Sequence, residues 1–192
     1  SMLSAIGRYS GFLQLGAILQ FLNYKFDYWI IQYFLDNAQL GFYTAAAETT
    51  QMTWLLSYTA SLILFPYLSD QKLITQEKRQ LFQLLSRLVA TGSILIFLVG
   101  GIFASHIMTL FFGKAFAGAG ASFAILLVGA SALNIARTHT ILLSANDMTQ
   151  FNFYGTAVGL GVTVPLDLLL IPNLGIVGAA WATTIAYCAI LT

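Results

Sequence analysis

Charged side chains are scarce in this chain of 192 residues. Lys and Arg together number 8 and Asp and Glu 7, so charged residues make up 8% of the sequence, against about 25% in ordinary soluble proteins. So few ionisable groups cannot cover the polar surface that a soluble fold of this size needs. A lipid-facing surface has no such need, and 58% of the residues are hydrophobic. The composition therefore predicts an integral membrane protein and excludes a soluble domain.

The sequence also lacks most of the groups that catalysis, metal binding or nucleic-acid binding would use. Cys188 is the single cysteine, so an internal disulfide and a cysteine-based metal cluster are excluded. Its place inside an apolar run predicts a buried, inert thiol. The net charge of +1 gives no reason to expect a nucleic-acid partner. Because there is also no Gly-rich phosphate loop, paired histidine motif or nucleophile elbow, we predict neither an enzyme nor a metal site.

Long apolar runs make up most of the chain. A helix that crosses the roughly 30 Å hydrocarbon core needs about 20 mostly apolar residues, and the sequence holds six such segments. They cover residues 11–35, 43–68, 88–112, 118–143, 151–171 and 175–192. The runs are continuously apolar, without the alternation of a membrane barrel. We therefore predict an all-α integral membrane protein, with one bundle of about six transmembrane helices over residues 1–192.

Basic residues are unevenly distributed between the predicted loops. The segment 69–87 carries half of all Lys and Arg residues, namely Lys72, Lys78, Arg79 and Arg87. By the positive-inside rule this loop is predicted to be cytoplasmic. Arg8 agrees with a cytoplasmic N-terminal end of the chain, whereas Lys114 falls on the other side. Leucines recur at helical spacing between residues 81 and 88, which predicts an amphipathic helix at the lipid interface.

A few charged side chains lie within the predicted spans. At the bilayer centre each costs at least about 2.5–3.5 kcal/mol, so such residues usually face a protein interior or a watery cavity. They are Lys25, Asp27, Glu48, Arg137 and Asp167. Lys25 and Asp27 are two residues apart, and a helix turns about 100° per residue, so they point to opposite sides of one helix. The segment 11–35 is therefore predicted to be an inner helix with protein or water on most sides.

Position along the spans separates the roles of these charges. Glu48 is placed to pair with Lys25 or another cation. Arg137 shares a polar stripe with Asn134, and it is expected either to line a cavity that opens toward the cytoplasm or to reach the headgroup region. Asp167 is expected to face the membrane interface near the end of its span. Central charges of both signs combined with short loops favour a solute pathway, so transport is the predicted function.

Several motifs follow one another in the order found in a known transporter family. They are NYKFD at 23–27, LGFYTAA at 40–46, FPYLS at 65–69, FGKAF at 112–116 and LIPNLGIVGAAWAT at 170–183. Together they resemble the C-terminal half of oligosaccharide flippases in the multidrug/oligosaccharidyl-lipid/polysaccharide exporter superfamily, and the last stretch is the most specific. One position departs from the pattern: Lys25 stands where arginine is common, which keeps a cation but not bidentate phosphate binding.

The resemblance implies one half of a transporter of about twelve to fourteen helices, in which two bundles enclose a cavity that opens to each side in turn. The cargo would be an oligosaccharide on undecaprenyl pyrophosphate, moved across the bacterial cytoplasmic (inner) membrane. The other expected partners are membrane lipids and the N-terminal six-helix bundle of the same protein. The chain begins with Ser1 and ends at Thr192 inside an apolar run, so we expect a piece of a longer protein.

The resemblance also suggests which residues meet the cargo. Lys25, Arg137, Asn23 and Asn134 are the candidates to line the cavity. Asp27 and Glu48 would hold those cations in place or carry a coupling proton or sodium ion, and no other cofactor is expected.

Three other functions stay open on these observations. An ion-coupled multidrug or cation exporter of the same superfamily would use Asp27 and Glu48 as its functional acids. A lipid II flippase would need a similar cationic cavity. A non-transporting membrane scaffold of a polysaccharide-synthesis complex would keep the central charges as plain interhelical salt bridges.

Overall fold

A computed structural model describes the backbone of residues 2–69, 75–145 and 149–191, and the side chains of residues 14–68, 76–141 and 153–190. Its elements are α1 (Met2–Phe34), α2 (Asn37–Gln51), α3 (Trp54–Ser69), α4 (Thr75–Ile102), α5 (Ala104–Phe112), the 3-10 helix η1 (Lys114–Ala119), α6 (Gly120–Ala145), α7 (Thr149–Leu174) and α8 (Ile176–Leu191). The described part of the chain holds no strand. Helical segments over 76–102, 114–141 and 153–174 are long and apolar enough to cross a membrane. The predicted all-α membrane fold is confirmed.

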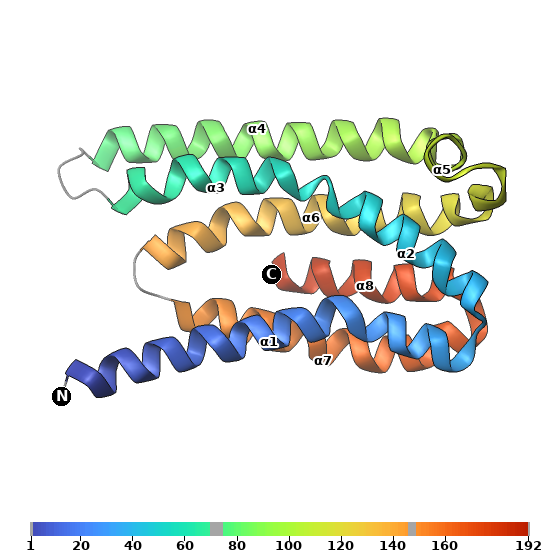
Figure 1. The fold of residues 1–192 in the computed structure, drawn as a ribbon. Helices are drawn as coiled ribbons and strands as arrows, with labels where there is room; N and C mark the ends of the chain where they lie inside the picture. The colour runs from blue at the N-terminus through green and yellow to red at the C-terminus, as the bar shows by residue number, and fades with distance from the viewer. Residues whose placement is uncertain (1, 70–74, 146–148, 192) are drawn as a thin grey trace.

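Most of the long helices lie side by side along one axis (Figure 1). The end of α3, the start of α4, the end of α6 and the start of α7 lie at one end of the bundle, together with the start of α1. The turns from α1 to α2 and from α7 to α8 lie at the opposite end. Helix α6 lies centrally and contacts α2, α3, α4 and α8, while α7 packs between α1 and α8. Polar groups on α1, α6, α7 and α8 are therefore brought together inside one bundle.

Two predicted spans are each built from two helical pieces. The span predicted over 43–68 is interrupted after Gln51, where α2 ends, and α3 begins at Trp54. The span predicted over 88–112 ends at Ile102, and the short α5 that follows turns across the end of the bundle (Figure 1). Average hydropathy does not register a break of one or two residues, because the apolar composition continues through it.

The predicted interfacial helix is continuous with the membrane span that follows it. Helix α4 runs without interruption from Thr75 to Ile102, and neither Gly nor Pro occurs before Gly92 to end it early. At 1.5 Å per residue its 28 residues extend roughly 42 Å, which exceeds the hydrocarbon core of about 30 Å. The amphipathic part is therefore an extension of this helix beyond the core.

The turn between α7 and α8 explains the most specific sequence motif. Gly175 adopts a left-handed conformation with φ of 61°, which glycine reaches at little cost and which ends α7. A Cβ atom at Gly178 would lie 2.3 Å from the carbonyl oxygen of Leu170, so only glycine permits this close approach. Ala179 and Ala180 beyond it are fully buried. The small residues of the motif therefore clamp α8 against α7.

The single cysteine corrects one expectation. Cys188 is exposed on the surface of α8 and does not lie in the bundle interior. The buried side of this helix carries Ala179, Thr183 and Ala186, and Cys188 lies on another side. Because lipid accepts apolar side chains on the outside of a bundle, an apolar run does not predict which of its residues are buried.

Candidate functional site

Asp27 is held in the bundle interior by hydroxyl groups. Its side chain is 3% exposed. Its Oδ2 atom accepts hydrogen bonds from the Tyr43 hydroxyl at 2.5 Å and from the Thr183 hydroxyl at 3.0 Å, whereas Oδ1 has no hydrogen-bond partner among the described residues. Side chains of α1, α2 and α8 therefore meet at one carboxylate, and none of them carries a positive charge.

A second carboxylate, Asp167, is buried beside it. Asp167 is 0% exposed, and neither of its oxygen atoms has a hydrogen-bond partner in the described part of the chain. It interacts electrostatically with Asp27. One turn earlier on α7, Thr163 donates a hydrogen bond of 3.1 Å to Asn23 on α1. Two turns of α1 (Asn23 and Asp27) thus face two turns of α7 (Thr163 and Asp167).

The buried position of Asp167 corrects the expectation that it faces the membrane interface. The span predicted over 151–171 stops before Pro172, but α7 continues through this proline to Leu174. Asp167 consequently lies seven residues before the end of α7, and Asp27 lies seven residues before the end of α1. Because α1 and α7 run side by side in the same direction (Figure 1), equal distances from the helix ends give the two carboxylates equal depth.

No basic side chain of the described residues forms an ion pair with Asp27 or Asp167. An ionised carboxylate that is buried without compensation costs several kcal/mol, and a second one nearby adds repulsion. A buried pair of this kind is therefore expected to carry protons or to bind a cation. Carboxylate, amide and hydroxyl oxygens are ligands for hard cations. Within the described residues, no group of three or more His, Cys, Asp or Glu side chains could hold a metal ion.

Lys25 and Glu48 form an ion pair on the outer face of α1 and α2. The Lys25 Nζ atom lies 3.1 Å from Glu48 Oε1, and the two side chains are 35% and 55% exposed. Tyr28 donates a hydrogen bond of 3.3 Å to the same carboxylate, and its ring centre lies 4.5 Å from Lys25 Nζ. Lys25 is nine residues before the end of α1, roughly 14 Å along the helix. Along α1, Lys25 therefore lies about half the thickness of a roughly 30 Å hydrocarbon core from the end of the helix.

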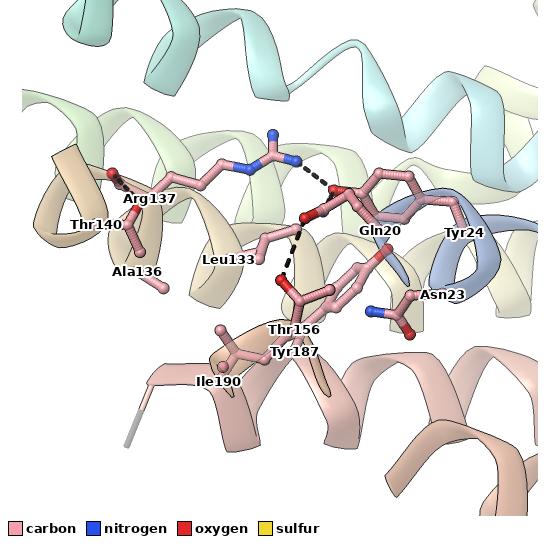
Figure 2. A pocket seen from close by; sticks show the side chains of 11 residues that line it. Gln20, Asn23, Tyr24, Leu133, Ala136, Arg137, Thr140, Thr156, Tyr187 and Ile190 are labelled. Carbon is pink, nitrogen blue, oxygen red and sulfur yellow. Dashed lines mark hydrogen bonds between the residues drawn. The ribbon is translucent and has the colours of Figure 1, made fainter. Parts of the chain in front are cut away.

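A separate polar pocket of about 510 Å³ lies between α1, α6, α7 and α8. Its lining includes Gln20, Asn23, Tyr24, Arg137, Thr156 and Tyr187 (Figure 2). The Arg137 guanidinium donates a hydrogen bond of 2.7 Å to the Tyr24 hydroxyl and lies 4.2 Å from the ring centre of Trp54. No carboxylate of the described residues lies within ion-pairing distance of Arg137. The pocket therefore contains a positive charge that no carboxylate of the described residues neutralises.

The structure does not bring the predicted cavity residues together. Arg137 and Asn23 line the pocket, whereas Lys25 lies on the outer face. Asn134 is fully buried elsewhere: it accepts a hydrogen bond of 2.8 Å from Ser57 and donates one of 3.2 Å to the carbonyl of Thr53. It therefore supports the junction between α2 and α3 and does not line the pocket.

Several residues of the interior site were not predicted from the sequence. Tyr43, Thr163 and Thr183 look like ordinary span residues, because a single hydroxyl in an apolar run has many structural uses. The spacing on α7 carried a usable signal: Gly159, Thr163, Asp167 and Ile171 repeat every four residues and are all buried. A polar residue on a stripe that also contains glycine indicates a helix face that packs against protein.

Comparisons with known proteins agree with this architecture. The Haloferax volcanii protein named "Probable low-salt glycan biosynthesis flippase Agl15" is 26% identical over 167 residues, which cover 84% of this chain and 34% of that protein. The chain thus spans about a third of the length of this relative. No solved structure matches the chain. A model of the family described as "Polysaccharide biosynthesis protein" matches residues 1–121, more than half of the sequence. The chain therefore belongs to the family of polysaccharide biosynthesis proteins.

Proposed function

We propose that the chain is part of a flippase that moves oligosaccharides linked to undecaprenyl pyrophosphate across the cytoplasmic membrane by alternating access. Membership of the polysaccharide biosynthesis family supports a glycan cargo, and the name of the Haloferax relative supports flipping. Its partners in this role are the lipid-linked cargo, the surrounding lipids and an N-terminal six-helix bundle of the same protein, which supplies the opposite wall of the cavity.

The observation that carries this proposal is the exposed ion pair between Lys25 and Glu48, two residues that lie within predicted membrane spans. Lys25 and Glu48 face outward from the bundle, and charges facing lipid near the bilayer centre would cost about 2.5–3.5 kcal/mol each by insertion scales. A water-filled cavity between two bundles removes that cost. Within such a cavity Lys25 attracts the pyrophosphate of the cargo as a point charge, without the two-pronged geometry of arginine. Glu48 and Tyr28 hold the lysine in place.

We propose that the interior carboxylate pair supplies the driving force. Asp27 and Asp167 would bind a proton or a sodium ion, and the ion's binding and release would favour different conformations of the bundle. The unpartnered oxygen atoms of both side chains support this role. Because the pair lies inside the bundle and Lys25 on its face, the cargo and the coupling ion would occupy different places.

The proposed orientation puts the connection between α3 and α4 in the cytoplasm. Lys78 and Arg79 at the start of α4, and Arg87 along its extension, support this side. The polar pocket lies toward the same end of the bundle, because Arg137 is in the C-terminal half of α6 and Thr156 is in the N-terminal half of α7. The pocket would then be reached from the cytoplasm.

The experiment replaces Lys25 by alanine in the full-length protein and measures display of the surface glycan in cells. We expect Lys25→Ala to abolish display at normal expression, because the cargo loses its cationic contact. Lys114→Ala is the matched control. Lys114 is an exposed lysine at the start of η1, away from the Lys25–Glu48 pair, so its loss should leave display unchanged. Normal display in Lys25→Ala cells would refute the proposal.

An ion-coupled drug exporter is the second candidate, because a buried carboxylate pair would serve it equally well. That function predicts that Asp27→Asn removes drug resistance while surface glycan is made normally. A lipid II flippase would instead lose cell-wall synthesis in the Lys25→Ala strain. A scaffold predicts that either change lowers the assembly of the synthesis complex and leaves the transport rate per molecule unaltered.

A further inference from the structure

Two cavities of very different size lie next to each other inside the bundle and share two lining residues. The pocket of about 510 Å³ contains Arg137, and a cavity of about 20 Å³ lies against Asp27, Tyr43 and Thr183. The smaller one has room for about one water-sized group. Tyr24 and Tyr187 line both cavities. These two side chains therefore form the partition between the open pocket and Asp27.

Tyr24 is held in this partition from several sides. Its hydroxyl accepts a hydrogen bond from the Arg137 guanidinium (Figure 2) and another from the Gln20 amide. Its ring centre lies 4.9 Å from that of Trp54. Trp54 in turn lies under the Arg137 guanidinium. A charge-assisted hydrogen bond is stronger than a neutral one, so Arg137 is the main restraint on the tyrosine hydroxyl.

Arg137 also presents a positive charge on the pocket side of the partition. Because no described carboxylate pairs with it, its field opposes the approach of a second cation. A cation in the pocket therefore meets both a steric obstacle, the Tyr24 ring, and an electrostatic one. Both are removed together if the guanidinium moves away from Tyr24.

We propose that the pocket is the entrance through which the coupling cation reaches Asp27 and Asp167, and that Tyr24 held by Arg137 is the gate of this entrance. The inference rests on the coupling site proposed above. Arg137 acts through Tyr24 and is a positioning residue, not a ligand of the cation. The arrangement explains why Arg137, which forms no ion pair within the described residues, lies near two acids that form none there either.

The test measures sodium and proton flux down a gradient in vesicles that contain the full-length protein without cargo. Tyr24→Phe keeps the ring but removes the hydroxyl that Arg137 holds, and Arg137→Gln removes the restraint and the charge. We expect flux to rise about tenfold in both variants, the effect of losing one charge-assisted hydrogen bond. Arg137→Lys should restore most of the restriction. Tyr58→Phe, on an exposed tyrosine of α3, is the matched control and should not change the flux.

A second substitution shows which route the ions take. Adding Asp167→Asn to Tyr24→Phe should abolish the extra flux, because the ions pass through the carboxylate pair. Extra flux that persists in this double variant would overturn the gate, as would wild-type flux in both single variants. If neither the wild-type protein nor any variant shows flux that depends on Asp167, both the proposed gate and the proposed coupling site are refuted. The flippase assignment would still stand or fall by the Lys25→Ala experiment, so the two failures are distinguishable.

Discussion

Lys25 and Asp27 lie two residues apart on α1 and occupy opposite environments. Lys25 faces outward, is 35% exposed, and is neutralised by Glu48 at 3.1 Å. Asp27 faces inward, is 3% exposed, and shares its surroundings with another acid, Asp167. The outer pair is neutral by itself, whereas the inner pair is proposed to take up a proton or a cation. What distinguishes the proposed cargo site from the proposed ion site is therefore which charges lie beside each other, more than how deep they lie.

The largest expected effect comes from neutralising the inner pair. We expect Asp167→Asn in the full-length protein to abolish any rise in melting temperature on adding sodium or on lowering the pH, because the second carboxylate is gone. Wild-type protein should show that rise, since a ligand that binds only the folded state stabilises it. Glu48→Gln on the outer face is the matched control and should keep the rise. An equal response in Asp167→Asn and wild type would remove the distinction between the inner and outer pairs.

An intermediate effect on stability is expected for two tyrosines that each donate a hydrogen bond to an acidic side chain. Tyr43 donates to Asp27 in the fully buried interior, and Tyr28 donates to the exposed Glu48. We expect Tyr43→Phe to lower the free energy of unfolding by about 1–3 kcal/mol, because a buried carboxylate loses one of its two hydrogen-bond donors. Tyr28→Phe should cost less than about 1 kcal/mol, because water replaces an exposed partner. Denaturant titration of both variants measures the difference, and equal losses would contradict the assignment of inner and outer sites.

The smallest expected effect is that of Lys25→Arg. The outer site needs a cation near Glu48, and arginine supplies one. We expect surface glycan display to stay at or slightly above the wild-type level, which a quantitative assay of the glycan would show. A complete loss of display would mean that the outer site recognises the shape of lysine and not simply its charge.

Much of the fold could be predicted from composition and from the position of charges. Scarcity of charge indicates a membrane protein, and the spacing of Lys25 and Asp27 is by itself enough to place them on opposite sides of α1. The breaks at Met52 and Phe103 could not be predicted, because each depends on tertiary packing and interrupts an otherwise apolar run.

The inner site was only half visible in the sequence. Asp27 stands out as a charge in the middle of a span, but Asp167 lies close to Pro172, and a proline commonly marks the end of a helix. Which face of α7 meets α1 is decided by the packing of small residues along the whole bundle. The depth of Asp167 and its proximity to Asp27 are therefore known only from the structure. The chemistry proposed for the two acids depends on that proximity.

Transport by the reconstituted full-length protein tests ion-coupled flipping most directly. Vesicles would carry a labelled, polyprenyl-pyrophosphate-linked oligosaccharide, and its transfer between leaflets would be measured with and without a sodium or proton gradient. We expect transfer that one of these gradients accelerates in the wild-type protein, and transfer that neither gradient changes in Asp167→Asn. Wild-type protein that leaves the glycan lipid in its original leaflet, or an Asp167→Asn variant that responds fully to the gradient, would contradict ion-coupled flipping.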